Sequence, residues 1–495
     1  AASPTVAGRP EDRAAAIDGG GPVDAAGFSR TAGFSHAAGE ADDVEPLAPP
    51  PGSALAAARN AAFVNPQPAR GGLSMHSGNC GEFGASAMAV PSSPACGEEG
   101  RLGAAWGRLG VQLHSGEYGS FLKRICAYPL PHRHGRYALG DLVGRAGQLS
   151  SLAARELDSH RRLLFFDAET TGLGVGAGNI PFMVGLGYYD DAQFIVEQLF
   201  IRHPGEEAEM LRYLQEKLRR FTHIVTYNGR AFDWPVMKNR FVMNRLRLAE
   251  EPSPIDLLYP SRSLWKHSLP SCRLGNVEAD KLGFIRRDDV PGSLAPALYV
   301  QFLAEGDPAV LSGVFRHNEL DILSLAGLAI HFAKLLSGDI PTGEPDAEEM
   351  YRLALWLDQT GKEELARRFM AQLSESAWHD RHEVLPRVAE WYKKRNQHDL
   401  AARLWRRYVD GAVRRASGIG AWVELAKYYE HRLRDYAEAL RCAEEALEMS
   451  RRRASLMRRG TSQDPDVAEL QRRIERLRRK LSRAKPSSLY AGTLV

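Results

Sequence analysis

Between residues 163 and 335, short apolar runs alternate with longer amphipathic ones, and this alternation limits the possible folds more than any other feature of the chain. Residues 163–166 (LLFF) form an apolar run bounded by charge, which is typical of a buried strand. Residues 182–189 and 194–201 are two more strand-like runs, and the Asp190-Asp191 pair between them predicts a hairpin. Strands that alternate with helices predict an α/β domain.

The amphipathic runs in this region predict helices. Residues 206–221 carry Met210, Leu211, Leu214 and Leu218 on one helical face. Further elements are expected at 223–227 (a strand), at 232–245 (a helix with a proline in its first turn) and at 308–335 (a long helix that ends before a glycine).

Two carboxylates follow the first strand. Asp167 and Glu169 are two residues apart, so on a strand they project from the same face, with their bases ~6–7 Å apart. Two carboxylates that point into one space repel each other unless a cation lies between them, and hard oxygen ligands suit Mg²⁺ or Mn²⁺. The alternative is a pair of ordinary surface acids at a strand end, and the pair alone does not decide between the two.

Two later segments favour the metal site. Residues 227–233 (YNGRAFD) follow the fourth strand and place Asp233 at the start of the next helix. His317 and Asp321 are four residues apart on the last helix and therefore share a face. Four acids that meet at one sheet edge can hold two cations ~3.5–4 Å apart, as two-metal phosphodiester hydrolysis requires. An imidazole beside them can take the proton of the attacking water near neutral pH.

The order of these segments resembles a known family. D-x-E-T-T-G-L at 167–173, Y-N-G-x-x-F-D at 227–233 and H-N-x-x-D-I at 317–322 resemble the three exonuclease motifs of the DEDD superfamily of 3′–5′ exonucleases, which has the ribonuclease H fold. Within it, the chain is similar to the YprB-like bacterial group, which typically carries a C-terminal tetratricopeptide region. The resemblance covers roughly residues 120–335, including 128–135 (YPLPHRHG) and 289–293 (DVPGS).

This resemblance implies a fold, a ligand set and an activity. The fold is a ribonuclease H-like mixed five-stranded sheet flanked by helices. The ligands of two Mg²⁺ or Mn²⁺ ions are Asp167, Glu169, Asp233 and Asp321. The activity is metal-dependent hydrolysis of DNA or RNA from the 3′ end. The alternatives are an endonuclease of the same fold and a non-catalytic scaffold that binds nucleic acid or protein.

One position departs from the family pattern. Members carry Tyr four residues before the last Asp or His five residues before it, whereas here His317 lies four before and Arg316 five before Asp321. A shift of one residue rotates a side chain ~100° around a helix. We predict that His317 takes the tyrosine position with the chemistry of histidine and accepts or orients the proton of the water. The alternative is that His317 only packs or hydrogen-bonds.

The resemblance also implies contacts with the end of the nucleic acid. Thr170 and Leu173 stand where the strand-end loop of the family touches the 3′ end, and Asn228 and Phe232 are expected to contact the terminal nucleotide. Phe232 equally suits a helix core. Asp256 suits either a second acid behind the site or a strand-end cap, and we favour the cap.

Two other patterns are less specific. The glycines at 172, 174, 176 and 178 suggest a phosphate loop, but the Gly-Lys-Ser/Thr ending is missing and a strand follows, so a hairpin loop is favoured. His132 and His134 lack an accompanying Cys or acid pattern, so a separate metal site is not expected there.

The first hundred residues differ in composition from the rest. They contain 24 Ala, 15 Gly and 11 Pro with no sustained period, which predicts a disordered tail at 1–100, followed by a lead-in segment at 101–160. Five scattered cysteines exclude a disulfide scaffold and favour a reducing cytoplasm. No run approaches ~18 consecutive apolar residues and no secretory leader is evident, so we expect a cytoplasmic protein without a membrane span.

The chain becomes helical and repetitive after the predicted nuclease domain at 161–338. Residues 354–370 align with 389–405 at an offset of 35, and 422–447 is the clearest further copy. A period near 34 with Ala and an aromatic one turn later resembles tetratricopeptide repeats, here over 345–450, whose groove is expected to bind a protein partner. A generic helical bundle is the alternative.

The C-terminal segment 451–495 is basic. Residues 451–485 hold 13 Lys or Arg against 4 Asp or Glu. These cations can grip phosphates, or they can be the solvated face of a capping helix whose apolar stripe is Leu470, Ile474, Leu477 and Leu481. The sequence favours neither interpretation.

Overall fold

The computed structural model describes residues 103–172, 176, 178–339, 346–375, 383–411, 418–456 and 465–484. The predicted disordered tail at 1–100 and Leu173 lie outside these residues.

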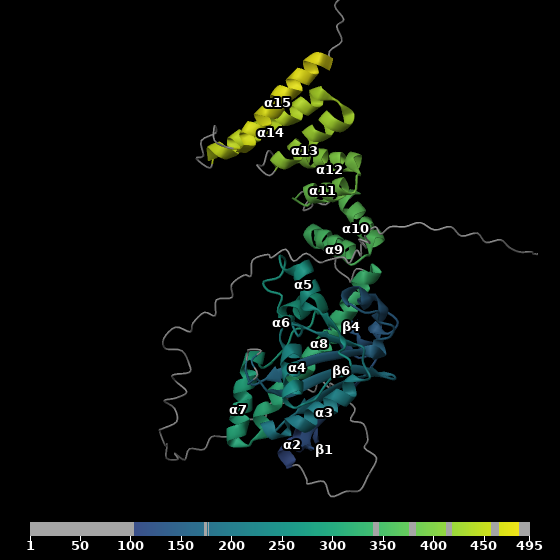
Figure 1. The fold of residues 1–495 in the computed structure, drawn as a ribbon, viewed down its shortest axis with the longest axis vertical. Coiled ribbons are helices and arrows are strands. Elements are labelled where there is room, and N and C mark those ends of the chain that lie inside the picture. Colours follow the sequence, from purple (N-terminus) through teal and green to yellow (C-terminus); the bar gives the residue numbers. More distant parts are fainter. Residues whose placement is uncertain are drawn as a thin grey trace, which may run out of the picture. The chain divides into compact units, whose positions relative to one another are not determined.

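A mixed sheet forms the centre of the first folded region (Figure 1). Its strand order is β1-β2-β7-β6-β5-β8-β9. Neighbours from β1 to β5 in this order run antiparallel, whereas β5, β8 and β9 run parallel. The strands are β1 (Val111–Gly116), β2 (Gly119–Pro129), β5 (Leu163–Thr170), β6 (Pro181–Asp190), β7 (Gln193–Phe200), β8 (His223–Thr226) and β9 (Ser253–Asp256), and β3 (Arg133–His134) pairs separately with β4 (Tyr137–Ala138).

The predicted α/β architecture is confirmed, but the expected number of five strands is corrected to seven in the described chain. The two additional strands at the edge, β1 and β2, come from the segment predicted as a lead-in, and β2 pairs with β7 along most of its length. Only Val111 of β1 is buried, so this strand lacks the alternation of apolar and polar residues that reveals a strand in sequence.

Helices cover both faces of the sheet. In β5, Leu164 and Phe166 face one core together with α3 (Glu207–Leu218), α4 (Asp233–Met243) and α7 (Ala295–Glu305). Leu163 and Phe165 face the other core, which includes most of α8 (Ser312–Ser337) and α5 (Leu258–Trp265). This alternation follows from the two-residue period of a strand.

Two glycines of β6 allow α8 to lie close to the sheet. A Cβ atom on Gly185 would lie 2.4 Å from Oδ1 of Asn318, and one on Gly187 would lie 2.5 Å from Cγ2 of Ile322. Gly185 is the strand partner of Asp167, so the first half of α8 passes directly over the first predicted ligand. The G-L-G sequence of β6 therefore sets how closely the helix approaches the acids of β5.

The segment Pro308–Ser337 corrects one expectation. It is long and apolar enough to cross a membrane by length and composition, with a mean hydropathy of 1.5, although no such segment was expected. Ionisable residues such as Glu319, Asp321 and Lys334 interrupt its apolar run, which is why a search for unbroken runs misses it. Since 89% of the apolar 18-residue stretch of this segment is buried inside the protein, packing in the core accounts for its apolar character.

The C-terminal region consists of consecutive helices that pack in pairs. Fully buried alanines, among them Ala354, Ala389 and Ala426, occupy the recurring small positions recognised in the sequence and allow close contact between helices. The assignment of these pairs to the tetratricopeptide class stays a prediction. The helices are α9 (Ala347–Gln359), α10 (Glu363–Glu375), α11 (Leu385–Lys394), α12 (His398–Gly411), α13 (Ile419–Tyr428), α14 (Tyr436–Leu456) and α15 (Pro465–Ala484).

The basic helix α15 packs by its apolar stripe. Leu470, Ile474 and Leu477 are buried, as a capping helix requires. Three of its cations converge on the buried carboxylate of Glu430: Arg473 at 3.1 Å, Arg476 at 2.9 Å and Lys480 at 2.9 Å. A large part of the positive charge of α15 is therefore engaged within the protein.

Candidate metal centre at the end of β5

The carboxylates of β5 face the helix α8. Asp167 and Glu169 lie on the same face of the strand, and the pairing with β6 shifts by one residue at Glu169/Thr170, where the strand ends. Glu169 is 9% exposed. The strand therefore delivers two largely buried carboxylates to the space beneath α8.

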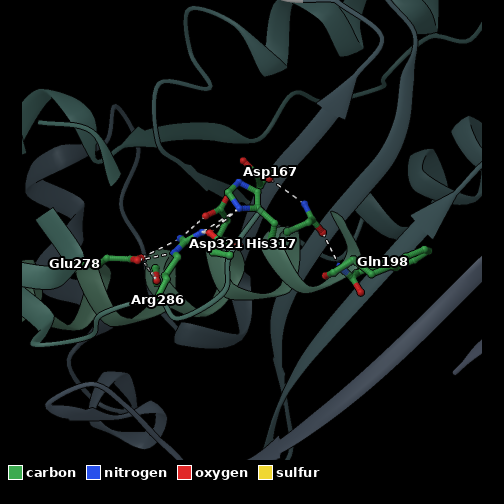
Figure 2. Close-up of polar contacts among 10 residues, drawn as sticks. Asp167, Gln198, Glu278, Arg286, His317 and Asp321 are labelled. Atoms are coloured by element: carbon green, nitrogen blue, oxygen red, sulfur yellow. Dashed lines mark hydrogen bonds and ion pairs between the residues drawn. The ribbon is translucent and has the colours of Figure 1, made fainter. Parts of the chain in front are cut away.

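His317 and Asp321 enter the same space from α8. Their Nε2 and Oδ2 atoms are 3.4 Å apart, as expected for residues one turn apart on a helix. One ligand atom each from Glu169, His317 and Asp321 lie within 4.8 Å of one another, so this trio can hold a metal ion. Figure 2 shows Asp167, His317 and Asp321 gathered at this point. The structure thus brings together four of the five residues predicted to be catalytic.

Asp233, the fifth of these residues, is the first residue of α4 and is 7% exposed. It is not part of the compact trio, but its charge acts on Asp167 and Glu169. The loop before it is held by Asp256, whose carboxylate accepts hydrogen bonds from the backbone N–H groups of Asn228 (2.8 Å) and Arg230 (3.1 Å). Asp256 also accepts from the N–H of Leu258, so it serves as the cap favoured from the sequence.

The predicted substrate contacts differ in their surroundings. Asn228 is exposed and adopts a left-handed backbone conformation with φ of 66°, which asparagine tolerates better than most residues. The hydroxyl of Thr170 donates to the carbonyl of Gly172 at 2.6 Å and so shapes the loop after β5. Phe232 is half-buried at the start of α4. A role in binding substrate stays a prediction for each of these residues.

A chain of polar contacts positions Asp167. The side-chain amide of Asn318 donates to Oδ2 of Asp167 at 2.9 Å, and Gln198 donates to Oδ1 of Asn318 at 2.9 Å (Figure 2). Arg124 of β2 in turn donates to Gln198 at 2.7 Å and to Glu319 at 2.7 Å. Strand β2, which lies between β1 and β7, therefore helps to fix the orientation of Asp167.

A second network centres on Arg286, which sequence reasoning did not single out. Its guanidinium forms an ion pair with Asp321, donates to both oxygens of Glu278 at 2.5 and 2.9 Å, and donates to Asp289 at 3.0 Å. Figure 2 shows Arg286 between Glu278 and Asp321. The imidazole Nδ1 of His317 lies 2.8 Å from Oδ2 of Asp289. Arg286 therefore neutralises part of the acid cluster.

The network of Arg286 reaches the predicted lead-in segment. The hydroxyl of Ser324 donates to Glu278 at 2.5 Å, and the Nε2 atom of His134 lies 2.8 Å from that hydroxyl. Burial lowers the pKa of His134 to about 3, so its imidazole is neutral and serves as a buried hydrogen-bond partner. The imidazole of His134 therefore belongs to the network of Arg286, and the absence of a separate metal site at His132 and His134 stays a prediction.

Burial and mutual repulsion perturb the acids. Desolvation, followed by the charges of Asp321 and Asp233, raises the pKa of Asp167 well above its ordinary value. Desolvation and the charge of Asp167 do the same for Glu169. Desolvation raises the pKa of Asp233 to about 7. Acids whose ionised forms are this unfavourable are typical of sites that bind a cation.

The residues present fit a divalent cation of the Mg²⁺ or Mn²⁺ type. The donor set is mainly carboxylate oxygen with one imidazole. In addition, Oδ1 of Asp289 is buried without a hydrogen-bond partner among the described residues. An unpartnered buried carboxylate oxygen next to a cluster of acids leaves negative charge that a cation would neutralise. The identity of the metal belongs to the proposal below.

Arg286, Glu278, Asn318 and Gln198 are the supporting residues that sequence reasoning missed. Asn318 directly follows the predicted His317, so its place on α8 was available from the spacing. Asp289 lies in a segment that carried the family resemblance but received no role. Glu278 and Arg286 lie outside every recognised motif, so no sequence signal pointed to them.

The fold and the acid cluster together define a protein of the ribonuclease H superfamily. The sequence profile of the RNase_H superfamily matches residues 164–333, which span β5 to α8. The chain is also 34% identical over 385 residues to the uncharacterized protein YprB of Bacillus subtilis strain 168, an alignment that covers 76% of this chain and 90% of that protein. The chain therefore belongs to the YprB-like group of this superfamily, as its motifs indicated.

Proposed function

We propose that this protein is a metal-dependent 3′–5′ exonuclease that hydrolyses DNA or RNA and releases mononucleotides. The observation that carries the proposal is the convergence of ligand atoms from Glu169, His317 and Asp321 within 4.8 Å, in a ribonuclease H-like fold. Asp167 and Asp233 act on the same space through their charges. In this proposal Asp167, Glu169, Asp233 and Asp321 hold two Mg²⁺ or Mn²⁺ ions.

The side chains of the site support a division of roles. Bound divalent ions supply the activation of the attacking water and neutralise the phosphate. Nδ1 of His317 lies 2.8 Å from Oδ2 of Asp289; in the proposed mechanism this nitrogen carries the proton and donates to Asp289, which fixes the ring and leaves the Nε2 lone pair on the side of Asp321. From there Nε2 can accept the proton of the water. Asn318 holds Asp167 in place, and Arg286 orients Asp321 through its ion pair.

The test compares labelled strands. Single-stranded DNA and RNA, labelled at either end, are incubated with Mn²⁺ and the wild-type protein, Asp167→Asn or Asp321→Asn. We expect mononucleotides to leave the 3′ end with the wild type, and turnover to fall to background in both variants while their circular dichroism spectra stay unchanged. Full activity in either variant would refute the assignment, and cleavage of a circular strand would favour an endonuclease.

A non-catalytic scaffold is the second candidate, and two observations favour it. Arg286 forms an ion pair with Asp321, so the protein itself balances part of the negative charge of the site. The helical region contains a groove of about 620 Å³ between α11 and α15, whose lining includes Trp405, Val423 and Leu470. This mixed apolar and charged groove suits a protein partner. A titration with Mn²⁺ distinguishes the two candidate functions. Only the nuclease requires tight binding of the ion, and Asp167→Asn should weaken that binding.

A further inference from the structure

The chain carries no carboxylate between the end of β9 and the residues that follow α6 (Leu274–Val277). From Leu257 to Val277 there is no Asp or Glu, whereas Arg262, Lys266 and Arg273 are cationic. In a protein with nearly equal numbers of acids and bases, 61 against 64, such a segment is a local concentration of positive charge.

Helix α5 presents part of this charge to solvent on one face. Leu258, Leu264 and Trp265 are buried in the core. Tyr259 is 48% exposed, and Arg262, one turn later, is exposed as well. The exposed face of α5 therefore combines an aromatic ring with a cation, the pair of side-chain types that bind nucleotide bases and phosphates.

Two further arginines lie next to this face. The guanidinium of Arg230 lies 5.9 Å from the centre of the Tyr259 ring. The hydroxyl of Tyr227 donates to the carbonyl of Cys272 at 2.6 Å, which places Arg273 near the loop that follows β8. Burial raises the pKa of Cys272, and the charge of Arg262 opposes this rise, so Arg262 also lies near Cys272. Arg230, Tyr259, Arg262 and Arg273 thus form one surface, called here the α5 strip.

The topology places the α5 strip at the same edge of the sheet as the metal centre. Strands β5, β8 and β9 are parallel, so their carboxyl ends meet at one edge. Asp167 and Glu169 lie at the end of β5, Asn228 and Arg230 follow β8, and Tyr259 follows β9. Asp256 joins the two loops by accepting hydrogen bonds from the N–H groups of Arg230 and Leu258. A nucleic-acid strand whose 3′ end lies in the metal centre can therefore continue along this edge of the sheet.

The arginines of the α5 strip are available for phosphates. Arg230, Arg262 and Arg273 are exposed, and none forms an ion pair with a carboxylate among the described residues. Several cations of α15, by contrast, are bound to Glu430 or Glu444. Counterion release favours cations that are not already paired, so the strip is the better site for a polyanion.

We propose that the α5 strip binds the phosphates and one base of a single nucleic-acid strand upstream of the end that enters the metal centre. The inference rests on the proposed nuclease function and adds the path of the substrate. Arg230, Arg262 and Arg273 contact phosphates, and Tyr259 stacks on a base. The strip therefore contributes to the binding of long strands and much less to that of strands too short to reach it.

The experiment measures by fluorescence anisotropy how the protein binds fluorescein-labelled single strands of 4 and 20 nucleotides. EDTA prevents hydrolysis, and the KCl concentration is varied from about 50 to about 400 mM, a range over which counterion release changes the affinity strongly. The full chain is compared with Arg230→Gln/Arg262→Gln/Arg273→Gln and with Tyr259→Ser. The matched control is Arg451→Gln/Arg472→Gln/Arg479→Gln, which removes the same charge from α14 and α15. Hydrolysis by the wild type with Mn²⁺ is measured separately.

For the 20-nucleotide strand we expect the slope of log K against log salt to fall by about 2 in the strip variant, since each lost phosphate contact on a single strand contributes ~0.7. Tyr259→Ser should weaken binding about tenfold, near the lower range of base stacking. The control variant should keep the wild-type slope. An unchanged slope in the strip variant, or an equal loss in the control, overturns the inference. If the wild type binds the strands but hydrolyses none, the proposed nuclease function fails while the binding strip stands.

Discussion

The charge on three buried carboxylates makes the metal-free protein sensitive to pH. Desolvation, with mutual repulsion, raises the pKa of Asp167 and Glu169 well above their ordinary values and that of Asp233 to about 7. Between the unfolded value of about 4 and this higher value, the folded protein binds protons that the unfolded chain does not. The contribution of these three acids to the free energy of unfolding in EDTA should therefore fall as pH rises from 4 to 7, by the sign of proton linkage. The buried imidazoles of His134 and His331, whose pKa values burial lowers to about 3, contribute in the opposite direction, so the effect of the acids is measured as a difference between wild type and variant.

Thermal unfolding scans in EDTA and in Mn²⁺ check this prediction. We expect Mn²⁺ to raise Tm more at pH 7 than at pH 4, because the ion binds the ionised folded protein. Asp233→Asn removes one titrating group, so in EDTA the Tm of this variant should rise relative to that of the wild type as pH increases from 4 to 7. A Tm difference between Asp233→Asn and the wild type that does not change with pH in EDTA would contradict the raised pKa of Asp233.

Arg286 should stabilise the metal-free protein by compensating the acids that surround it. Its guanidinium, 11% exposed, pairs with Glu278, Asp289 and Asp321. Removing one partner of a buried ion pair costs about 3–5 kcal/mol because the other charge stays buried. We expect Arg286→Met to lower the free energy of unfolding in EDTA by about that amount, measured by urea denaturation.

The neighbouring Arg287 provides the control for this variant. It is exposed and forms no ion pair with any acid in the described part of the chain, so Arg287→Met should change stability by less than ~0.5 kcal/mol. Mn²⁺ should recover part of the stability lost in Arg286→Met. Equal stability of the two variants would show that Arg286 does not compensate the cluster.

The acidic residues of the site were predictable from the sequence, whereas the residues that hold them in place were not. Asp167 and Glu169 follow an apolar strand at a spacing that fixes their common face, and Asp321 lies one helical turn from His317. Such relations are local and visible in sequence. Arg286 contacts Asp321 across 35 residues and Glu278 across 8 residues, and these contacts depend on how the chain folds back and leave no regular spacing.

The close packing of α8 on β6 depends on residues without side chains. Adding a methyl group at Gly185 places it 2.4 Å from Oδ1 of Asn318, the side chain that holds Asp167. Because Asn318 is fully buried, it cannot move aside without losing its hydrogen bonds. We expect Gly185→Ala to lower the free energy of unfolding by about 1–3 kcal/mol and to reduce the proposed hydrolysis of nucleic acid.

A glycine of α13 offers the comparison. A Cβ atom on Gly420 would meet nothing within 4 Å, so Gly420→Ala should keep activity and raise stability slightly, as alanine favours helices. Denaturation curves and turnover of both variants check the contrast. Wild-type activity in a stably folded Gly185→Ala protein would mean that the Asn318 contact does not position Asp167.

The central strands and helices were visible in sequence, and the edge strands were not. β6 and β7 form the predicted hairpin, and Asp191 adopts a positive φ of 44° at the turn between them. β8 and α3 also lie where the hydrophobic pattern placed them. The edge strand β1 has a single buried residue, and in β2 the four buried residues come in two adjacent pairs, so neither strand shows the alternation that reveals a strand in sequence.

The two interpretations of the basic C-terminal segment are linked through Glu430. The apolar stripe of α15 is buried, and Arg473, Arg476 and Lys480 surround one carboxylate on the preceding helical region. Burial disfavours the ionised form of Glu430, but the hydrogen bonds from Arg476 and Lys480 outweigh it and lower the pKa to about 2. This pairing crosses more than 40 residues, so sequence spacing did not reveal it.

Loss of the Glu430 charge should loosen α15 from the helical region. Glu430→Gln leaves three cations without their common carboxylate, and breaking a buried ion pair costs about 3–5 kcal/mol. The matched control is Glu444→Gln, since Glu444 pairs with Arg478 at an exposed position where such pairs contribute at most ~1 kcal/mol. We expect hydrogen exchange of α15 amides to accelerate strongly in Glu430→Gln and little in Glu444→Gln, while the exchange of β5 and β6 stays unchanged. Equal protection of α15 in both variants would show that the apolar stripe alone holds this helix, and its cations would then be free to bind phosphate.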